Sequence, residues 1–306
     1  MELSRDRMND KKEVFMRKKH VAYFALLIIV ALLFSGCDAM ITNAYKTMNL
    51  GQPDPEKIIK YDATTLLEES GVISSSGVSD DFIAAVISDP GTKQNVISKL
   101  EALAVPSQPP GKAQPAQTLI IDIEIADIGA DTLIDKFNEA LLELPNMTTE
   151  EGQEPEVGDI IDLLIPETLQ NDTTKLKDVI NGLHDSSLDS EIEALAELIR
   201  PEGATENTVV ENLNYGTIAQ TAALILIVQS IEPASGSELT PGGAVVAALE
   251  ELEKGEEGHP ENFISFNKEN LTDNTALPIL FEAAGAQKLY DELMKGLSGG
   301  DGGSNP

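Results

Sequence analysis

The 306-residue sequence contains one cysteine, Cys37, and no tryptophan, and aromatic residues make up only 4% of it. A single thiol excludes disulfides within the chain and zinc sites built on several thiolates, so a core alone must hold the fold. The shortage of aromatic residues argues against carbohydrate-stacking sites and aromatic cages for choline-like cations. It also argues against a tight interface built on tyrosine and tryptophan hot spots.

Basic residues are scarce as well: 21 Lys and Arg stand against 52 Asp and Glu. Residues 1–36 contain seven of the basic residues and four of the acidic ones, so the rest of the chain has 14 basic and 48 acidic residues, a net charge of −34. Such a charge repels the phosphates of nucleic acids and of anionic lipid head groups. We therefore expect no nucleic-acid partner.

Despite this acidity, 42% of the residues are hydrophobic, and they recur at helical spacing along the chain. This is enough apolar material for a folded core. The periodic segments are short and unequal, and no fixed repeat of 20 to 50 residues is visible. The sequence predicts an all-α fold, either an irregular multi-helix bundle or a solenoid-like helical array.

The first half of the uncharged stretch 212–231 is polar, and only its last ten or so residues are strongly apolar, too few to span a bilayer. A helix that is apolar on all sides is normally central in a bundle. We predict that this segment is buried core, with contact to a partner or a bilayer as the alternative.

Residues 119–128 fit two structures. Ile121, Ile123 and Ile125 alternate with acidic residues, as in a half-buried strand, but the apolar residues also fit a helix that continues through Leu144. We favour the long helix, because no partner strand is visible elsewhere. In such a helix Glu124, Asp127 and Asp131 share a face.

The densest acidic group among apolar residues lies in and after this segment and comprises Asp122, Glu124, Asp127, Asp131 and Asp135. The shared face could attract Ca²⁺, but the spacing differs from that of the twelve-residue calcium loop. A solvated helix face is the preferred interpretation.

The sequence shows no recognisable catalytic or cofactor motif: a zinc-protease helix, a nucleophile elbow, a phosphate loop and a dinucleotide fingerprint are all missing. His20 lies near the N-terminus, while His184 and His259 stand alone in sequence. A helix C-terminus accounts for His184 without catalysis. We therefore predict no catalytic residue, no cofactor and no metal site.

Near the N-terminus a basic cluster, Arg17-Lys18-Lys19-His20, precedes fourteen apolar residues, Val21 to Phe34, and then Ser35-Gly36-Cys37. The apolar run is shorter than the roughly twenty residues of a transmembrane helix and has the length of a signal-peptide core. Small residues are needed at the cleavage site, because the peptidase holds that stretch extended in a tight pocket. The only cysteine of the chain follows them directly.

This segment resembles the lipobox of bacterial lipoproteins, although Phe34 stands where the family usually has leucine. The resemblance covers about twenty residues. It implies cleavage between Gly36 and Cys37, and lipidation of Cys37 with a diacylglycerol thioether and an acylated amino group, palmitate being a typical acyl chain. It also implies an extracytoplasmic protein, periplasmic or at the surface, whose partner is the cell membrane through the lipid anchor.

Signal peptides usually begin close to their basic cluster, whereas here fifteen residues of mixed charge precede Met16. Lys12-Glu13-Val14 can also be encoded by a purine-rich ribosome-binding sequence just upstream of the Met16 codon. We expect translation to begin at Met16, with a long leader starting at Met1 as the alternative.

Four prolines between Pro106 and Pro115 predict a linker and a candidate domain boundary. The predicted organisation is a signal peptide (1–36), a lipidated tether (37–52), a helical N-terminal segment (53–104), a Pro-rich linker (105–117), a helical main domain (118–298) and a disordered tail (299–306).

With this organisation and no catalytic motif, we expect a lipid-anchored acidic envelope protein that binds or scaffolds an unknown envelope protein or small ligand. The alternative is an envelope hydrolase that uses carboxylates for acid/base chemistry, which would require a pocket containing a carboxyl group of raised pKa.

Overall fold

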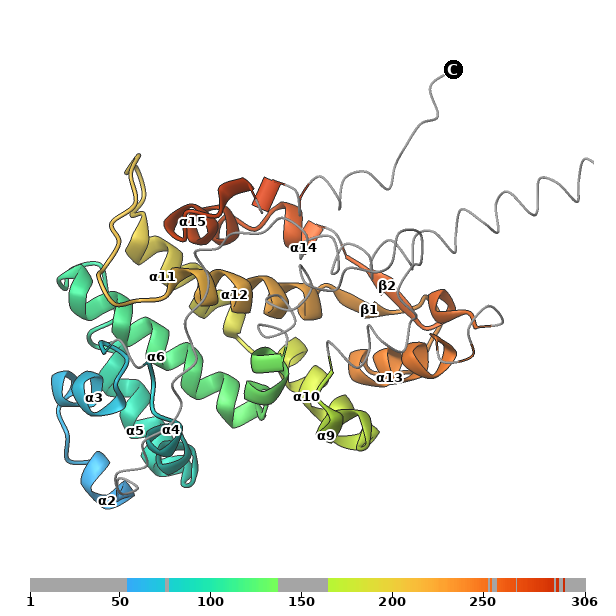
Figure 1. Cartoon of the computed structure of the whole chain (residues 1–306), viewed down its shortest axis with the longest axis horizontal. Helices are drawn as coiled ribbons and strands as arrows, with labels where there is room; N and C mark the ends of the chain where they lie inside the picture. The colour runs from blue at the N-terminus through green and yellow to red at the C-terminus, as the bar shows by residue number, and fades with distance from the viewer. Residues whose placement is uncertain are drawn as a thin grey trace, which may run out of the picture.

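A computed structural model describes residues 54–74, 77–136, 165–252, 254, 258–267, 269–288, 290, 291 and 294. The predicted signal peptide, Cys37, the tether and the tail lie outside the described residues. Within them the fold is a mostly helical, irregular arrangement, which confirms the predicted all-α class (Figure 1). None of the described helices combines the length and the apolar character needed to cross a membrane.

The N-terminal part consists of four short helices whose starts are specified locally. They are α2 (Pro55–Ile58), α3 (Ala63–Ser70), α4 (Asp80–Ile87) and α5 (Pro90–Glu101). Each is capped by a side-chain oxygen that accepts a hydrogen bond from a backbone N–H of its first turn; the capping residues are Asp54, Asp62, Ser79 and Asp89.

The next helix, α6 (Pro110–Ile128), corrects the predicted linker. Residues 110–117 are its first two turns and not a connection between domains, so the prediction of a linker over 105–117 is wrong for this part. Pro109 is the N-cap and Pro110 the first helical residue, positions where a missing N–H costs nothing. Only Pro115 lies inside the helix, where it removes one backbone hydrogen bond.

Helix α6 belongs to two apolar clusters at once. Leu119, Ile120 and Ile123 pack with α2–α5, whereas Ile121 and Ile125 pack with the later helices. Successive helical residues are rotated by about 100°, so these two sets lie on opposite sides of the helix. This explains why both a strand and a helix fitted the pattern at 119–128; the preferred helix is confirmed. It ends at Ile128, because Gly129 adopts φ 76° and caps it, so the predicted continuation through Leu144 is wrong.

The later part of the chain forms the larger cluster. Its elements are α9 (Glu167–Gln170), α10 (Thr173–Asp185), α11 (Leu188–Ile199), α12 (Tyr215–Gln229), strand β1 (Ile231–Pro233), α13 (Pro241–Leu252), the 3-10 helix η3 (Pro260–Asn262), strand β2 (Ile264–Phe266), α14 (Glu269–Thr272) and α15 (Ala276–Ala283). Helix α12 is buried along nearly its whole length, as predicted for the uncharged stretch. Helix α15 ends at Ala283, and Gly285 just beyond it takes φ 69°.

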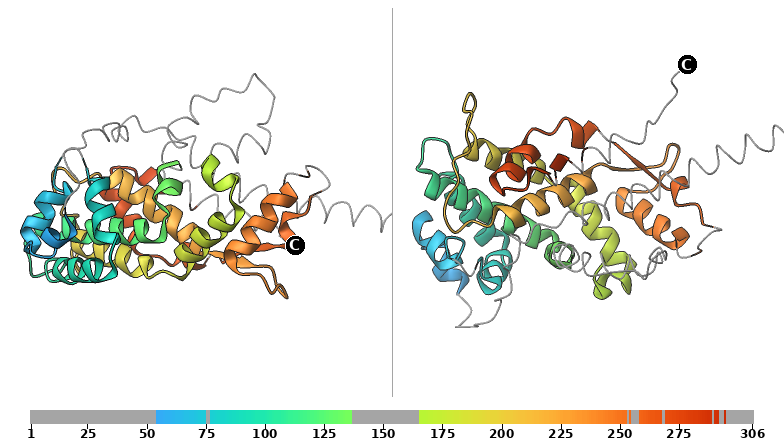
Figure 2. Two further views of the ribbon diagram at one scale, coloured as in Figure 1. Left: turned by 90° about the horizontal axis from the view of Figure 1, so that it is seen from below. Right: turned by 45° about the horizontal axis from the view of Figure 1, so that its top comes forward.

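The two short strands pair antiparallel, with Ile231 opposite Phe266. They were not predicted, because three residues are too few for alternation to be visible and Pro233 weakens a strand pattern. Together with α13 they form one end of the elongated molecule, and α2–α5 form the other end (Figures 1 and 2).

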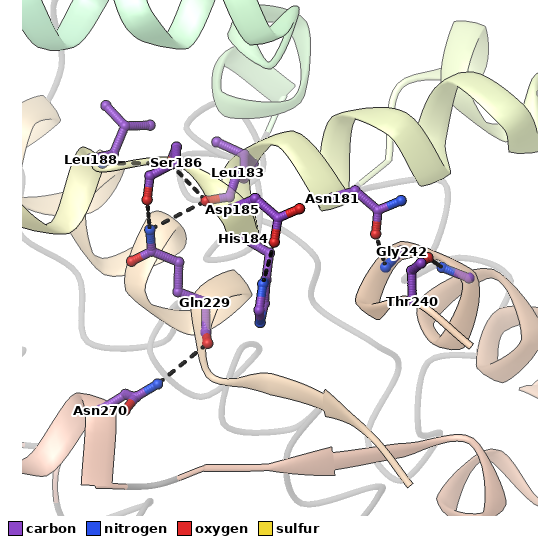
Figure 3. A network of polar contacts seen from close by, with 11 residues as sticks. Asn181, Leu183, His184, Asp185, Ser186, Leu188, Gln229, Thr240, Gly242 and Asn270 are labelled. Atoms are coloured by element: carbon purple, nitrogen blue, oxygen red, sulfur yellow. Dashed lines mark hydrogen bonds and ion pairs between the residues drawn. The ribbon is translucent and has the colours of Figure 1, made fainter. Parts of the chain in front are cut away.

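Helix α13 is held against α10 by the close approach of Gly242 to Lys177 (the Asn181–Gly242 contact is seen in Figure 3). The backbone N–H of Gly242 donates to Asn181 Oδ1 at 2.8 Å. A Cβ atom on Gly242 would lie 2.2 Å from the carbonyl oxygen of Lys177 and 2.9 Å from its carbon, and backbone atoms cannot swing aside. We expect Gly242→Ala to lower the free energy of unfolding by about 1–3 kcal/mol, measured by urea denaturation followed by circular dichroism.

The neighbouring Gly243 supplies the control. A Cβ there would lie 3.3 Å from the side-chain oxygen of Thr240 and 3.7 Å from Leu239 atoms, which are side chains at the start of the helix. Gly243→Ala is therefore expected to change stability little or to raise it by up to about 1 kcal/mol, the usual gain of alanine over glycine in a helix. Equal destabilisation by both substitutions would contradict the packing described for Gly242.

Candidate functional site

A cavity of about 440 Å³ lies where α4, α6, the start of α12 and the helical residues 131–136 come together. This is within the range of small-molecule sites. Its lining comes from four separate parts of the chain, namely residues 72–87, 118–126, 131–135 and 212–221. α6 supplies one wall with Thr118, Asp122, Ile125 and Ala126, which lie along the edge between its two cluster-packing faces.

The floor and the rim of the cavity differ in character. Ile83, Ile125 and Ile134 line it and are at most 9% exposed, so they form an apolar floor. Asp80, Asp131 and Asp135 also line it but are exposed, which places their carboxylates toward solvent. The floor of the site is therefore apolar and its entrance is acidic.

A strip of polar side chains runs along the wall where α6 faces α12. It consists of Thr118 and Asp122 on α6, one helical turn apart, and Thr217 and Thr221 on α12, also one turn apart. The same four residues line a second, smaller cavity of about 40 Å³ that reaches Ile121, Ile192 and Leu195 of the larger core cluster. The polar strip therefore lies deep in the site.

Two threonines of the polar strip are nearly buried. Thr118 is 8% exposed and donates to the Gln114 carbonyl at 3.0 Å, which leaves its oxygen able to accept. Thr221 is 9% exposed and lines both cavities.

The charges around the cavity add up to a negative potential. Its lining contains four carboxylates, and among the described lining residues there is no Lys, Arg or His. Two helices begin at the cavity, α4 at Asp80 and α12 just after Asn214, and each contributes only about half a positive charge; α6 ends nearby with the opposite sign. The carboxylates therefore dominate the charge of the lining.

The acidic group singled out in the sequence is divided between two places. Asp122, Asp131 and Asp135 line the cavity, whereas Glu124 and Asp127 bind Lys93 of α5 at 2.8 and 2.6 Å. Partial burial alone would lower the pKa of the Lys93 ammonium, but its hydrogen bonds to Asp127 and Glu124 outweigh burial and raise that pKa.

The single face predicted for Glu124, Asp127 and Asp131 is wrong, because α6 ends before Asp131. Within the described residues no three His, Cys, Asp or Glu side chains come together in a way that could hold a metal ion.

The two histidines of the described region belong to different parts of the fold. His184 lies in the last turn of α10, as predicted, with Nδ1 3.2 Å from Asp185 Oδ1 (Figure 3). His259 is the N-cap of η3, and its backbone N–H donates to Glu251 at 3.3 Å. Neither residue lines the cavity.

Comparison of the chain with protein-family models, curated proteins and solved structures found no significant match. The site is therefore interpreted from its own geometry. The sequence singled out Asp122, Asp131 and Asp135 but not the threonines or the isoleucines beside them. The α6 threonine lies where the sequence predicts the start of a new domain, and the α12 threonines lie in a segment predicted to be buried core.

Proposed function

We propose that the protein is a lipid-anchored, strongly acidic helical envelope protein that acts as a binding module, with the cavity as its binding site. The proposed binding role rests on this cavity, because the cavity combines an apolar floor with polar groups from α6 and α12. The lipobox-like segment ending at Cys37 supports the anchor and the extracytoplasmic location.

The net negative charge supports a body that stands off an anionic membrane and is held there only by the lipid. A hydrolase would need a carboxyl group whose pKa is raised by burial. Three of the four aspartates that line the cavity are exposed, which does not favour that alternative.

Ala84→Phe tests the binding role, because Ala84 is an exposed residue of α4 that lines the cavity. A phenylalanine there would fill part of the entrance without disturbing the buried floor. We expect the full-length protein, extracted in dodecyl maltoside, to bind at least one of hexylamine, 1-hexanol and hexanoate in isothermal titration calorimetry. The substitution is expected to weaken that binding at least tenfold.

Ala102→Phe is the matched control, since Ala102 is exposed at the end of α5 and does not line the cavity. It should leave binding unchanged. If the protein bound none of the three compounds, or if both substitutions weakened binding equally, the cavity would not be the binding site.

A further inference from the structure

We infer that the cavity takes an uncharged aliphatic molecule that packs against both apolar clusters at once and joins α4 to α12. This inference rests on the proposed binding function and names the class of its ligand. It follows from the position of the cavity at the junction of the two clusters and from the charge of its lining.

The two clusters meet mainly through α6. Helices α2–α5 lie on one side of α6 and build the smaller cluster with it (Figure 1). Among the described elements, α6 is also the only later helix that α2–α5 contact extensively. Helices α10, α11, α12 and α15 belong to the larger cluster, which uses the other side of α6. One helix is therefore the main link between the two groups.

The cavity lies where this link is incomplete. Both α4 and the start of α12 line it, and as far as the structure describes them they make no extensive contact with each other. Ile83 and Ile87 bring apolar surface of the smaller cluster to the cavity. Ile125, Ile134 and Ile218 bring apolar surface of the larger cluster. A ligand in the cavity would therefore touch both clusters and add a link between α4 and α12.

The apolar part of the lining suits a chain of methylene groups. The five isoleucines have no hydrogen-bonding groups in their side chains, and the described lining contains no aromatic residue on which a ring would stack. Each methylene buried against them raises the affinity roughly fourfold. A hydroxyl group at one end of the chain can donate a hydrogen bond to the oxygen of Thr118 in the polar strip. The site therefore suits a linear alcohol.

The charges at the cavity disfavour an ionic ligand of either sign. The lining is dominated by carboxylates and contains no described Lys, Arg or His, so an anion would be repelled. Asp80, Asp122 and Asp135 each already have an interaction within the protein, so they do not require a cation from outside. An ammonium group would also lose water over an apolar floor that offers it no acceptor. An uncharged molecule avoids both costs.

The first experiment compares 1-hexanol, hexanoate and hexylamine, which share a six-carbon chain, and 1-butanol, which is two methylenes shorter. Binding is measured by titration calorimetry on the full-length protein in dodecyl maltoside, and the heat of the same titration into protein-free micelles is subtracted. We expect 1-hexanol to bind at least tenfold more tightly than hexanoate, with hexylamine between them. It should bind about fifteenfold more tightly than 1-butanol.

Two substitutions, one from each cluster, test whether the ligand touches both. Ile87 on α4 and Ile218 on α12 are partly buried and line the cavity. Ile87→Thr and Ile218→Thr keep a branched side chain but remove apolar contact, and each should weaken 1-hexanol binding about fivefold. Ile279→Thr is the matched control, because Ile279 is partly buried against the larger cluster and does not line the cavity. It should change binding less than twofold.

Amide hydrogen exchange of the wild-type protein tests the added link without depending on the folding of a variant. A saturating concentration of 1-hexanol should slow exchange at least threefold in α4 and in the first turns of α12, because the ligand holds these segments together. Exchange in α13, at the other end of the molecule, should not change.

The outcomes separate the ligand class from the binding role. Hexanoate or hexylamine binding as tightly as 1-hexanol, or 1-butanol binding as tightly as 1-hexanol, would overturn the uncharged aliphatic ligand and leave the binding role standing. Unchanged exchange in α4, or weaker binding in only one of Ile87→Thr and Ile218→Thr, would overturn the joining of the clusters and also leave the binding role standing. Absence of binding by all four compounds would overturn both proposals.

Discussion

Cys37→Ser is expected to abolish lipidation and with it stable membrane attachment. The predicted anchor consists of two or three acyl chains, and each buried methylene contributes about 0.8 kcal/mol, so the attachment is essentially permanent. Serine has a hydroxyl in place of the thiol, so it cannot form the thioether that attaches the diacylglycerol. In detergent-phase partitioning the wild-type protein should move into the detergent phase, and the variant should stay in the aqueous phase or retain its uncleaved leader.

Two further measurements make this test specific. The size of the variant on a gel separates an uncleaved leader from a cleaved, unlipidated chain. Met40→Ser, three residues further along, is the control and should partition like the wild type. If Cys37→Ser partitioned into the detergent phase as a cleaved chain at the wild-type level, the lipid anchor would be contradicted.

Gln114→Leu is expected to lower the free energy of unfolding by about 3–5 kcal/mol. Gln114 is fully buried in α6, and its Nε2 donates to the carbonyl oxygens of Leu198 at 3.0 Å and Thr208 at 2.7 Å. Its Oε1 accepts from the hydroxyl of Tyr215, which in turn accepts from the backbone N–H of Val210 at 2.8 Å. Leucine has a similar size but leaves these buried partners unsatisfied, at about 1–3 kcal/mol each.

The environment of Tyr215 belongs to the same network. Burial raises the pKa of its hydroxyl, although the hydrogen bond from Val210 acts in the opposite direction. Because Gln114 and Tyr215 share a hydrogen bond, Tyr215→Phe combined with Gln114→Leu should cost less than the sum of the two single substitutions. Additive costs would contradict the network.

Gln94→Leu is the matched control for Gln114→Leu. Gln94 is exposed on α5, and its amide lies 3.5 Å from the Ser98 hydroxyl, at the limit of a hydrogen bond. It should change the free energy of unfolding by less than about 0.5 kcal/mol. Urea denaturation of the full-length protein in detergent, followed by circular dichroism, measures all four variants. A cost for Gln114→Leu no larger than that for Gln94→Leu would contradict the buried hydrogen-bond network at Gln114.

The difference between Gln114 and Asp54 shows what the sequence can predict. The cap at Asp54 depends on residues within three positions, so an acidic side chain followed by proline is a local signal for the start of α2. The role of Gln114 depends on Leu198, Thr208 and Tyr215, which are 84, 94 and 101 residues away. The prolines around it carry a strong local signal for a break, and distant packing overrides that signal.

The cavity was unpredictable for the same reason. Asp122 and Asp131 belong to an acidic group that is visible in the sequence among apolar residues. The direction of each carboxylate, however, depends on where α6 ends. That end is set by the left-handed Gly129, and it separates the cavity aspartates from Glu124 and Asp127. The sequence around Thr221 does not indicate that it lines a cavity, since a threonine in an uncharged helix is usually buried in the core.

We propose that an acidic helical body is held at a membrane by a lipid on a single cysteine. Intact-mass spectrometry of the full-length protein, expressed in a bacterium and extracted from its membranes, is the decisive test. We expect a chain that begins at Cys37 and carries the added mass of a diacylglycerol and an acyl group. A chain that retains residues 17–36, or one with an unmodified thiol at Cys37, would contradict it.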